Sequence, residues 1–372
     1  MAKNIIVSYL GRHGAGAEYS FEMTRGLLAH GCNVYVIISA QVDNLELWKV
    51  LPVKKLFLIP TSNHYQDLIS ATWQFLFKYI GEIKSYFKNI KVDVLYAPMG
   101  HPWILVMRYL VFRDAKFVFT CHDPIVHPNE PLLPVLGQRC AIWMADSVVI
   151  LSKIFFNYMV EHYKKKRENI VVIPHGAFSH YDDVNYVNME ATFPIAKYNF
   201  LFFGRITKYK GIEMLAEAYR KLALERNDIS LRVIGSGDIS EYKEALASCP
   251  NTVVENRFVG DNEVCKYFSM PNTITVISYT SASQSGVIPI AMRANSLLIV
   301  TNNEGLLEQT LDGQLALISD ISMISLYMQM KNAVENFDDH KTMIRKAQDY
   351  INSLSWDNLA KILLDHINKA IA

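Results

Sequence analysis

The chain has 372 residues, of which 51% are hydrophobic, and its formal net charge is +1. This length exceeds what one ordinary core supports, so two domains are expected. A dedicated nucleic-acid binder usually carries a large basic excess, and the near-neutral balance argues against one. The five cysteines are scattered and no pair has metal-ligand spacing, so we expect free thiols in a reducing cytosol.

The N-terminus enters a strand at Asn4, which leaves no room for a signal peptide. No run of about 20 apolar residues is free of charge, so no membrane-spanning helix is predicted. We therefore expect a cytoplasmic protein, which can still contact the inner face of a membrane.

Short β-rich runs alternate with helical patterns along the whole chain. In the first half the expected strands are Asn4–Leu10, Asn33–Ala40, Val94–Ala97, Phe117–Thr120, Ser147–Leu151 and Val171–Ile173. In the second half they are Asn199–Phe203, Ser230–Ile234, Thr252–Glu255, Thr275–Ser278, Leu297–Val300 and Leu315–Ile318. Most of these runs are continuously apolar, which is typical of parallel strands buried on both faces, and the alternation with helices predicts an α/β fold.

The composition turns polar around 181–185 and stays irregular until Lys197. We predict two Rossmann-like, doubly wound domains at 1–182 and 183–355, with ligands bound at the carboxyl ends of the strands. The last segment, 356–372, is predicted to be an amphipathic helix. Its expected apolar side consists of Leu359, Ile362, Leu363, Ile367 and Ile371.

The first strand leads into a glycine-rich turn that contains Gly14 and Gly16 and opens a helix. Glycines let a ligand approach the backbone closely, and a helix N-terminus favours an anion. The dinucleotide fingerprint fails, because its third glycine falls on Tyr19. Later, His122 follows the strand that ends at Thr120. A lone histidine is more often structural, but a place at a strand's carboxyl end favours a site.

The most informative stretch is the loop that begins at Gly204 and ends at Gly211. A strand feeds a loop that carries Arg205 and Lys210, and a helical pattern then opens. Arg205 can bind two phosphate oxygens at once, while Lys210 adds a point charge beside the helix N-terminus. A solvated turn with two surface cations is the alternative.

Four further strands of the second half also end in candidate ligand loops. One has a turn at Gly235, and the next continues into Phe258 and Val259; for Phe258, a core position and a ligand contact are equally favoured. The turn Ser283-Gln284-Ser285-Gly286-Val287 offers the amides of Ser285, Gly286 and Val287 as a phosphate nest, with Gln284 beside them. Glu304 lies in the following strand-end loop.

The order Gly204-Arg205-x4-Lys210-Gly211 resembles the diphosphate-binding loop of GT-B glycosyltransferases of the family 4 type. The turn with Gly14 and Gly16 resembles that family's first glycine loop, and His122 resembles its histidine beside the transferred sugar. The resemblance implies a GT-B fold whose final helix crosses back onto the N-terminal domain. It also implies a nucleotide diphosphate sugar as donor, no cofactor or required metal, and retention of anomeric configuration, with Arg205 and Lys210 stabilising the leaving diphosphate. Residues implied in donor binding are Gly14, Gly16, Gly204, Gly235, Phe258, Val259, Gln284, Ser285, Gly286, Val287 and Glu304.

One family feature is missing. Family 4 enzymes usually carry a Glu-x7-Glu motif that contacts the donor sugar and the ribose. Here Ser281 or Ala282 stands at the first glutamate, and Ile290 or Ala291 at the second. The Ala-Ser-Gln-Ser-Gly-Val form resembles a variant within the broad family, so activity is still expected.

We expect transfer of a hexose to a glycan or lipid-linked acceptor, in the assembly of bacterial surface polysaccharide or lipopolysaccharide. A non-catalytic partner subunit and a nucleotide-sugar 2-epimerase remain open as alternatives, and no nucleic-acid partner is expected. Basic and aromatic residues mingle at 73–91, 103–113 and 163–167. Each segment alone is more typical of a core helix with a solvated face, but together they are compatible with peripheral contact with an anionic membrane.

Overall fold

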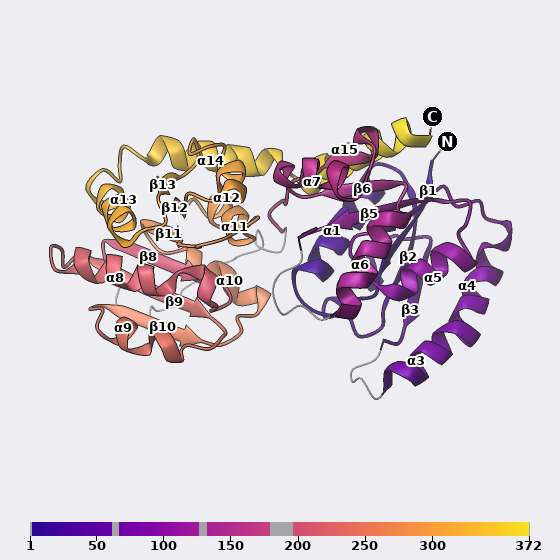
Figure 1. Ribbon diagram of the computed structural model, residues 1–372, viewed down its shortest axis with the longest axis horizontal. Coiled ribbons are helices and arrows are strands. Elements are labelled where there is room, and N and C mark those ends of the chain that lie inside the picture. Colours follow the sequence, from indigo (N-terminus) through magenta and orange to yellow (C-terminus); the bar gives the residue numbers. More distant parts are fainter. Residues whose placement is uncertain (1, 62–66, 126–131, 179–195, 372) are drawn as a thin grey trace. The chain divides into compact units, whose positions relative to one another are not determined.

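The computed structural model describes residues 2–61, 67–125, 132–178 and 196–371. They form two compact units, one built from Met1–Pro174 with Ser355–Ala372 and the other from His175–Leu354 (Figure 1). Each unit is a parallel sheet with helices, which confirms the expected α/β class. The predicted boundary at 182/183 lies outside the described residues.

The first unit contains a seven-stranded parallel sheet in the order β3-β2-β1-β4-β5-β6-β7. Its strands are β1 (Asn4–Tyr9), β2 (Asn33–Ser39), β3 (Lys55–Ile59), β4 (Val94–Ala97), β5 (Lys116–Cys121), β6 (Ser147–Ile150) and β7 (Ile170–Val172). Its α-helices are α1 (Ala15–Ala29), α2 (Leu45–Val50), α3 (Leu68–Gln74), α4 (Ile80–Tyr86), α5 (Pro102–Leu110), α6 (Leu132–Met144), α7 (Phe156–Glu161) and α15 (Trp356–Ile371). The strand order reverses between β1 and β4, and such a switch point is where α/β sheets bind ligands.

The last helix, α15, belongs to the first unit, which confirms that the chain's end crosses back. It packs against α1, where the rings of Tyr19 and Trp356 meet edge to face with centroids 5.4 Å apart. Gly26 permits this close approach, because a Cβ there would lie 2.6 Å from the Ala360 Cβ. Leu359, Leu363 and Ile367 are buried as predicted. Ile362 is a correction, since 39% of its surface is exposed on the outer side of the helix.

The second unit contains a six-stranded parallel sheet in the order β10-β9-β8-β11-β12-β13, with its switch point between β8 and β11. Its strands are β8 (Tyr198–Phe203), β9 (Ile229–Gly235), β10 (Thr252–Asn256), β11 (Thr273–Ile277), β12 (Leu297–Thr301) and β13 (Leu317–Ser319). Its α-helices are α8 (Ile212–Ala223), α9 (Lys243–Ala247), α10 (Asp261–Phe268), α11 (Val287–Arg293), α12 (Glu304–Gln309), α13 (Met323–Glu335) and α14 (Lys341–Ser353).

Every predicted strand is present, and the structure adds one, β3. This strand lies at the edge of its sheet and is only partly buried, although residues 56–59 form an apolar run like those that predicted the central strands. The last strand is shifted, because β13 begins at Leu317 rather than at Leu315. Among the residues that the structure describes, no helix is both long and apolar enough to cross a bilayer.

Candidate functional site

Two glycines bring the ends of β8 and β9 into close contact. Gly204 follows β8 with φ of 119°, and its amide donates to the Ile234 carbonyl at 2.9 Å. Gly235 ends β9 with φ of 148°, and a Cβ there would lie 1.8 Å from the Gly204 carbonyl oxygen. Both positions therefore require glycine, and the chain turns sharply away from the sheet at Arg205.

The loop from Arg205 to Lys210 is held against the end of β11. Its last residue before α8, Gly211, has φ of 66°, and a Cβ there would lie 2.0 Å from the Ser278 carbonyl oxygen. The Ser278 hydroxyl donates to the Lys210 carbonyl at 2.8 Å, and the Thr280 amide donates to the Tyr209 carbonyl at 2.7 Å. These contacts fix the backbone that carries both cations at the switch point of the sheet.

The two cations differ in their surroundings. Arg205 is exposed, whereas Lys210 is half-buried, with its Nζ 3.4 Å from the centroid of the buried Tyr279 ring. Burial, and secondarily the positive charge of Arg205, lower the pKa of Lys210 to about 7. Within the described part of the chain, neither side chain forms an ion pair with a carboxylate. The site therefore holds unpaired positive charge that an anionic ligand can neutralise.

Tyr279 connects this cation to the Ser-Gln-Ser-Gly turn. Its hydroxyl shares a 3.1 Å hydrogen bond with the Ser285 hydroxyl, which also accepts from the Val287 amide at 3.3 Å. The Ser285 amide donates to Gln309 Oε1 at 2.7 Å, and Gln309 Nε2 returns a 3.1 Å bond to the Ser285 carbonyl. Two of the three amides of the predicted phosphate nest thus already donate within the protein. The side chain of Val287 is buried, and the exposed Gly286 amide is the remaining candidate.

The start of α12, which carries Glu304, lies against the turn at 283–287. Glu304 is exposed in the first turn of α12, and Gln284 is half-buried. The next residue, Gly305, is tightly packed, because a Cβ there would lie 1.9 Å from the Ser283 carbonyl oxygen. The turn and the start of α12 therefore lie in direct contact, and the Glu304 carboxylate is close in the chain to that contact.

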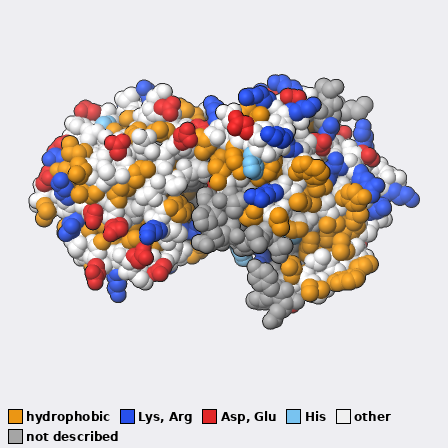
Figure 2. Space-filling model, viewed as in Figure 1, with side chains coloured by type: hydrophobic (Ala, Val, Ile, Leu, Met, Phe, Trp, Pro, Cys, Tyr) orange, Lys and Arg blue, Asp and Glu red, His pale blue; other side chains and the backbone are white. Residues whose placement is uncertain are grey.

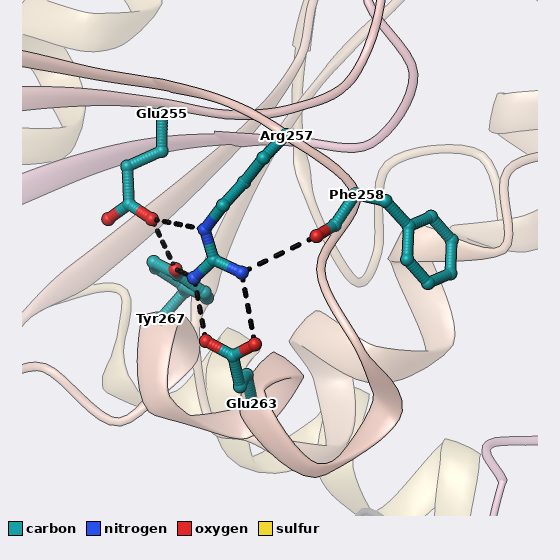
Figure 3. Close-up of polar contacts among 5 residues, drawn as sticks. All are labelled: Glu255, Arg257, Phe258, Glu263 and Tyr267. Atoms are coloured by element: carbon teal, nitrogen blue, oxygen red, sulfur yellow. Dashed lines mark hydrogen bonds and ion pairs between the residues drawn. The ribbon is translucent and has the colours of Figure 1, made fainter.

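Phe258 is not a core residue, since 77% of its surface is exposed at the carboxyl end of β10. Figure 3 shows the network that holds its loop. Arg257 donates to both oxygens of Glu263 on α10, at 3.0 and 2.6 Å, and to the Phe258 carbonyl at 3.4 Å. The Arg257 amide also donates to the Gly235 carbonyl at 3.0 Å. An exposed aromatic ring on a loop fixed in this way is a preformed stacking surface, whereas the neighbouring Val259 side chain is buried in the core.

In the first unit, His122 lies at the end of β5 as predicted. Its Nε2 donates to the Pro98 carbonyl at 2.9 Å, so this nitrogen carries the hydrogen. The ring meets Tyr19 edge to face, with centroids 4.9 Å apart. Tyr19 also contacts Trp356 of α15, so the final helix helps to fix the ring that orients His122.

The glycine turn after β1 has different surroundings. Gly14 begins α1 with φ of 78°, and a Cβ on Gly16 would lie 2.1 Å from the Met99 sulfur. Burial, then the charges of Asp43 and Glu18, raise the pKa of Tyr9 to about 12. Arg12 and His13 also lie in this turn, and His13 Nδ1 is 2.7 Å from Asp43 Oδ1. Basic and acidic side chains thus offset one another here, a set that suits a ligand with many hydroxyl groups better than a phosphate.

Sequence reasoning missed three contributors to these sites: Tyr279, Gln309 and Arg257. Tyr279 and Gln309 act through partners distant in sequence, which the order of the parallel strands brings beside them. Arg257 pairs with Glu263 only six residues away, and that spacing was the signal that could have found it. In the described part of the chain, no three His, Cys, Asp or Glu side chains are grouped as metal ligands.

Two family models match the chain. Residues 16–177 match the model described as Glycosyltransferase Family 4, and residues 197–333 match the one described as Glycosyl transferases group 1. A glycosyltransferase of unassigned role from Methanocaldococcus jannaschii is 27% identical over 174 residues, 43% of this chain and 42% of the relative. A D-inositol 3-phosphate glycosyltransferase from Arthrobacter is 25% identical over 48% of this chain and 44% of its own length. A lipopolysaccharide 1,2-N-acetylglucosaminetransferase from Salmonella typhimurium is 22% identical over 43% of this chain and 45% of its own length. The chain thus spans less than half the length of these curated relatives.

Solved structures match over the full length. A glycosyltransferase from Rickettsia africae superposes with a TM-score of 0.72 at 17% identity, covering 100% of this chain and 99% of the other. The HepE protein of Anabaena, solved with UDP and glucose, gives a TM-score of 0.70 at 14% identity and covers 99% of this chain and 100% of its own. At these identities the likeness concerns the fold.

Proposed function

We propose a reaction for this chain from the premise that it belongs to the family 4 glycosyltransferases of the GT-B fold. A hexose passes from a nucleotide diphosphate sugar to a hydroxyl group of a glycan or lipid-linked acceptor. The observation that carries the proposal is the pair Arg205 and Lys210, which is fixed at a sheet switch point without a carboxylate partner among the described residues. The HepE structure with UDP and glucose supports a nucleotide-sugar donor.

In this reaction the acceptor oxygen forms a bond to the anomeric carbon while the bond from that carbon to the β-phosphate oxygen breaks. The nucleoside diphosphate leaves with the electron pair and takes up the acceptor's proton. Front-face attack retains the anomeric configuration. Arg205 and Lys210 stabilise the negative charge that develops on the diphosphate, a task for which one preorganised donor is worth about 3 kcal/mol.

The rest of the donor has candidate partners on the same unit. The exposed ring of Phe258 can stack on the nucleotide base. Since the Glu-x7-Glu carboxylates are absent, we assign the sugar and ribose hydroxyls to Ser281, Ser283, Gln284 and Glu304. In the first unit, His122 positions the transferred sugar, and its fixed Nε2–H bond to Pro98 holds the ring in one orientation.

Surface polysaccharide or lipopolysaccharide assembly is the process we propose, supported by the Salmonella relative. A 2-epimerase would need carboxylates around the sugar ring for proton transfer, and residues 281–290 contain none. A non-catalytic partner subunit is favoured by that same lack of carboxylates and opposed by the retained cation pair.

The deciding experiment incubates the purified chain with UDP- and GDP-sugars and lipid-linked acceptors, in EDTA and in Mg²⁺. Release of nucleoside diphosphate with a glycosylated product, unchanged by EDTA, is expected. Interconversion of the donor sugar without release of the diphosphate indicates an epimerase. Nucleotide binding with neither reaction indicates the partner subunit.

A further inference from the structure

One helical segment of the first unit carries a row of large apolar side chains on its outer face. It comprises α3, a π-helical turn at Phe75–Tyr79, and α4. Trp73 and Phe77 are 59% and 73% exposed, and their rings stack in parallel with centroids 4.8 Å apart. Ile69 and Leu76 are also exposed beside them. Exposed apolar side chains gathered in this way indicate a binding surface rather than scattered surface residues.

The π-helical turn explains how these side chains come to face outward. The buried side chains of the segment are Phe75, Ile80, Ile83 and Phe87. Phe75 and Ile80 are five residues apart, which one extra residue in the turn accommodates without moving either from the core. Phe75 stacks on Trp103 with centroids 4.5 Å apart, so the inner side of the segment is satisfied by packing. The exposed side chains are therefore not core residues that lack a packing partner within this unit.

The charge around this row is strongly positive. The edge strand β3 with the residue before it, and residues 67–91, contain six lysines and two acidic residues, although the whole chain is almost neutral. The lysines are Lys54, Lys55, Lys78, Lys84, Lys88 and Lys91, and all are exposed. Figure 2 shows apolar side chains gathered on this part of the first unit, with basic side chains near them.

We propose that Ile69, Trp73, Leu76 and Phe77, the apolar row, together with these lysines, bind the surface of an anionic lipid bilayer. The aromatic side chains would enter the boundary between headgroups and acyl chains, while the lysines contact lipid phosphates. A second copy of the chain fits this surface less well, because self-association would bring two sets of lysines together. The proposal does not depend on the catalytic assignment.

A different basic cluster in the same unit suits a membrane less well. In the run Lys164 to Arg167, Lys165 Nζ donates to the carbonyls of Ala145 at 2.6 Å and Trp143 at 3.1 Å. Arg167 lies over the Phe156 ring, 5.5 Å from its centroid. Lys55 of β3 and Lys78 of the helical segment also lie over aromatic rings, at 5.1 to 5.7 Å from the centroids. The difference is that Lys165 is held by two backbone carbonyls, whereas the helical segment adds the exposed apolar side chains, so the helical segment is the stronger surface.

The test is flotation of the full chain with vesicles of equal phosphatidylglycerol and phosphatidylcholine, compared with phosphatidylcholine alone. Binding to the anionic vesicles is expected and should weaken with salt. The double variant Trp73→Ser/Phe77→Ser should bind at least tenfold more weakly, and Lys78→Gln/Lys84→Gln/Lys88→Gln should lose most of the salt dependence. Leu224→Ser, at a still more exposed apolar position in the second unit, is the control and should bind as the wild type does.

A second readout keeps the test valid if the double variant folds poorly. Brominated lipids should quench part of the wild-type tryptophan emission, and Trp73→Phe should remove that part alone. Undiminished flotation of the double variant would overturn the proposal, as would equal binding to both vesicle types. A dimer in sedimentation equilibrium that the double variant abolishes, without vesicle binding by the wild type, would identify a second copy as the occupant instead.

Discussion

The two units build the same element, a first strand that turns through glycines into a helix, but surround it with different charged side chains. After β1, the turn with Gly14 and Gly16 contains Arg12 and His13 and lies near Asp43 and Glu18, which contribute to the raised pKa of Tyr9. After β8, the turn carries Arg205 and Lys210. The helix N-terminus adds a similar positive end in both cases, so the side chains decide which ligand is favoured.

Under the proposed function, this difference favours separate roles for the two turns. The second unit's turn is suited to a diphosphate, whose charge two cations can neutralise. The first unit's turn is suited to neutral hydroxyl groups, because its carboxylates offset the basic side chains of Arg12 and His13 and can accept hydrogen bonds from a sugar. A shared fold therefore does not imply a shared ligand.

The largest expected effect tests the cationic turn. Arg205→Ala and Lys210→Ala should each lower turnover by about 100-fold or more, since each removes one preorganised charge from the leaving group. Lys208→Ala is the control, because this exposed lysine lies in the same loop. The comparison of the two turns fails if Lys208→Ala is as damaging as the other two, when rates are measured by diphosphate release.

His122 provides the corresponding test on the first unit. His122→Ala should lower kcat by roughly 10- to 100-fold, as for loss of a positioned catalytic group. It should leave the affinity for UDP or GDP unchanged, because it lies on the unit without the cations. His122→Gln can keep a donor for the Pro98 carbonyl and should recover part of the rate. If the affinity of His122→Ala for the diphosphate falls together with kcat, this division of roles is contradicted.

Phe258 is expected to have the next largest effect. Phe258→Ala should weaken binding of the nucleotide by about tenfold, within the 1–3 kcal/mol that base–aromatic stacking provides. Phe258→Tyr retains the ring and should bind as the wild type does. Calorimetry with the free nucleoside diphosphate measures the change. Equal affinities of the alanine and tyrosine variants for this ligand would show that the base does not stack on Phe258.

The pH dependence of diphosphate binding tests the charge state of Lys210. Because its pKa is lowered to about 7, the free lysine loses its charge as pH rises through 7, while the diphosphate keeps its own. Affinity for the diphosphate should therefore fall by roughly fivefold between pH 7 and pH 8. Lys210→Arg keeps a permanent charge and should bind with little change over this range. Calorimetry in several buffers should also detect proton uptake on binding by the wild type, and its absence would show that the lysine is already charged.

The sequence predicted the central features because they depend on local patterns. Continuously apolar runs identified every central strand, and the spacing of Arg205 and Lys210 identified the cationic turn. The edge strand β3 was missed although residues 56–59 are continuously apolar, and its partial burial reflects its place at the edge of the sheet. The contact of Lys210 with Tyr279 could not be predicted, since it depends on which strands are neighbours in the sheet. Phe258 was ambiguous because exposure, not composition, distinguishes a stacking surface from a core residue.

The smallest expected effect concerns the sugar itself. Neutral hydroxyl and amide groups replace the usual carboxylates around the turn at 281–286, and each such contact is weaker by roughly 1 kcal/mol. Most of the donor's binding energy should then come from the cationic turn, so UDP or GDP should bind nearly as well as the corresponding sugar conjugate. Glu304→Gln, which removes the carboxylate of the residue before Gly305, should change the affinity for the conjugate by no more than a few-fold. Calorimetry with both ligands tests this on the wild type. A conjugate bound more than about 100-fold tighter than the diphosphate, a difference of roughly 2.7 kcal/mol, would mean that strong sugar-binding groups lie elsewhere. It would also mean that the contrast between the two turns describes only part of donor recognition.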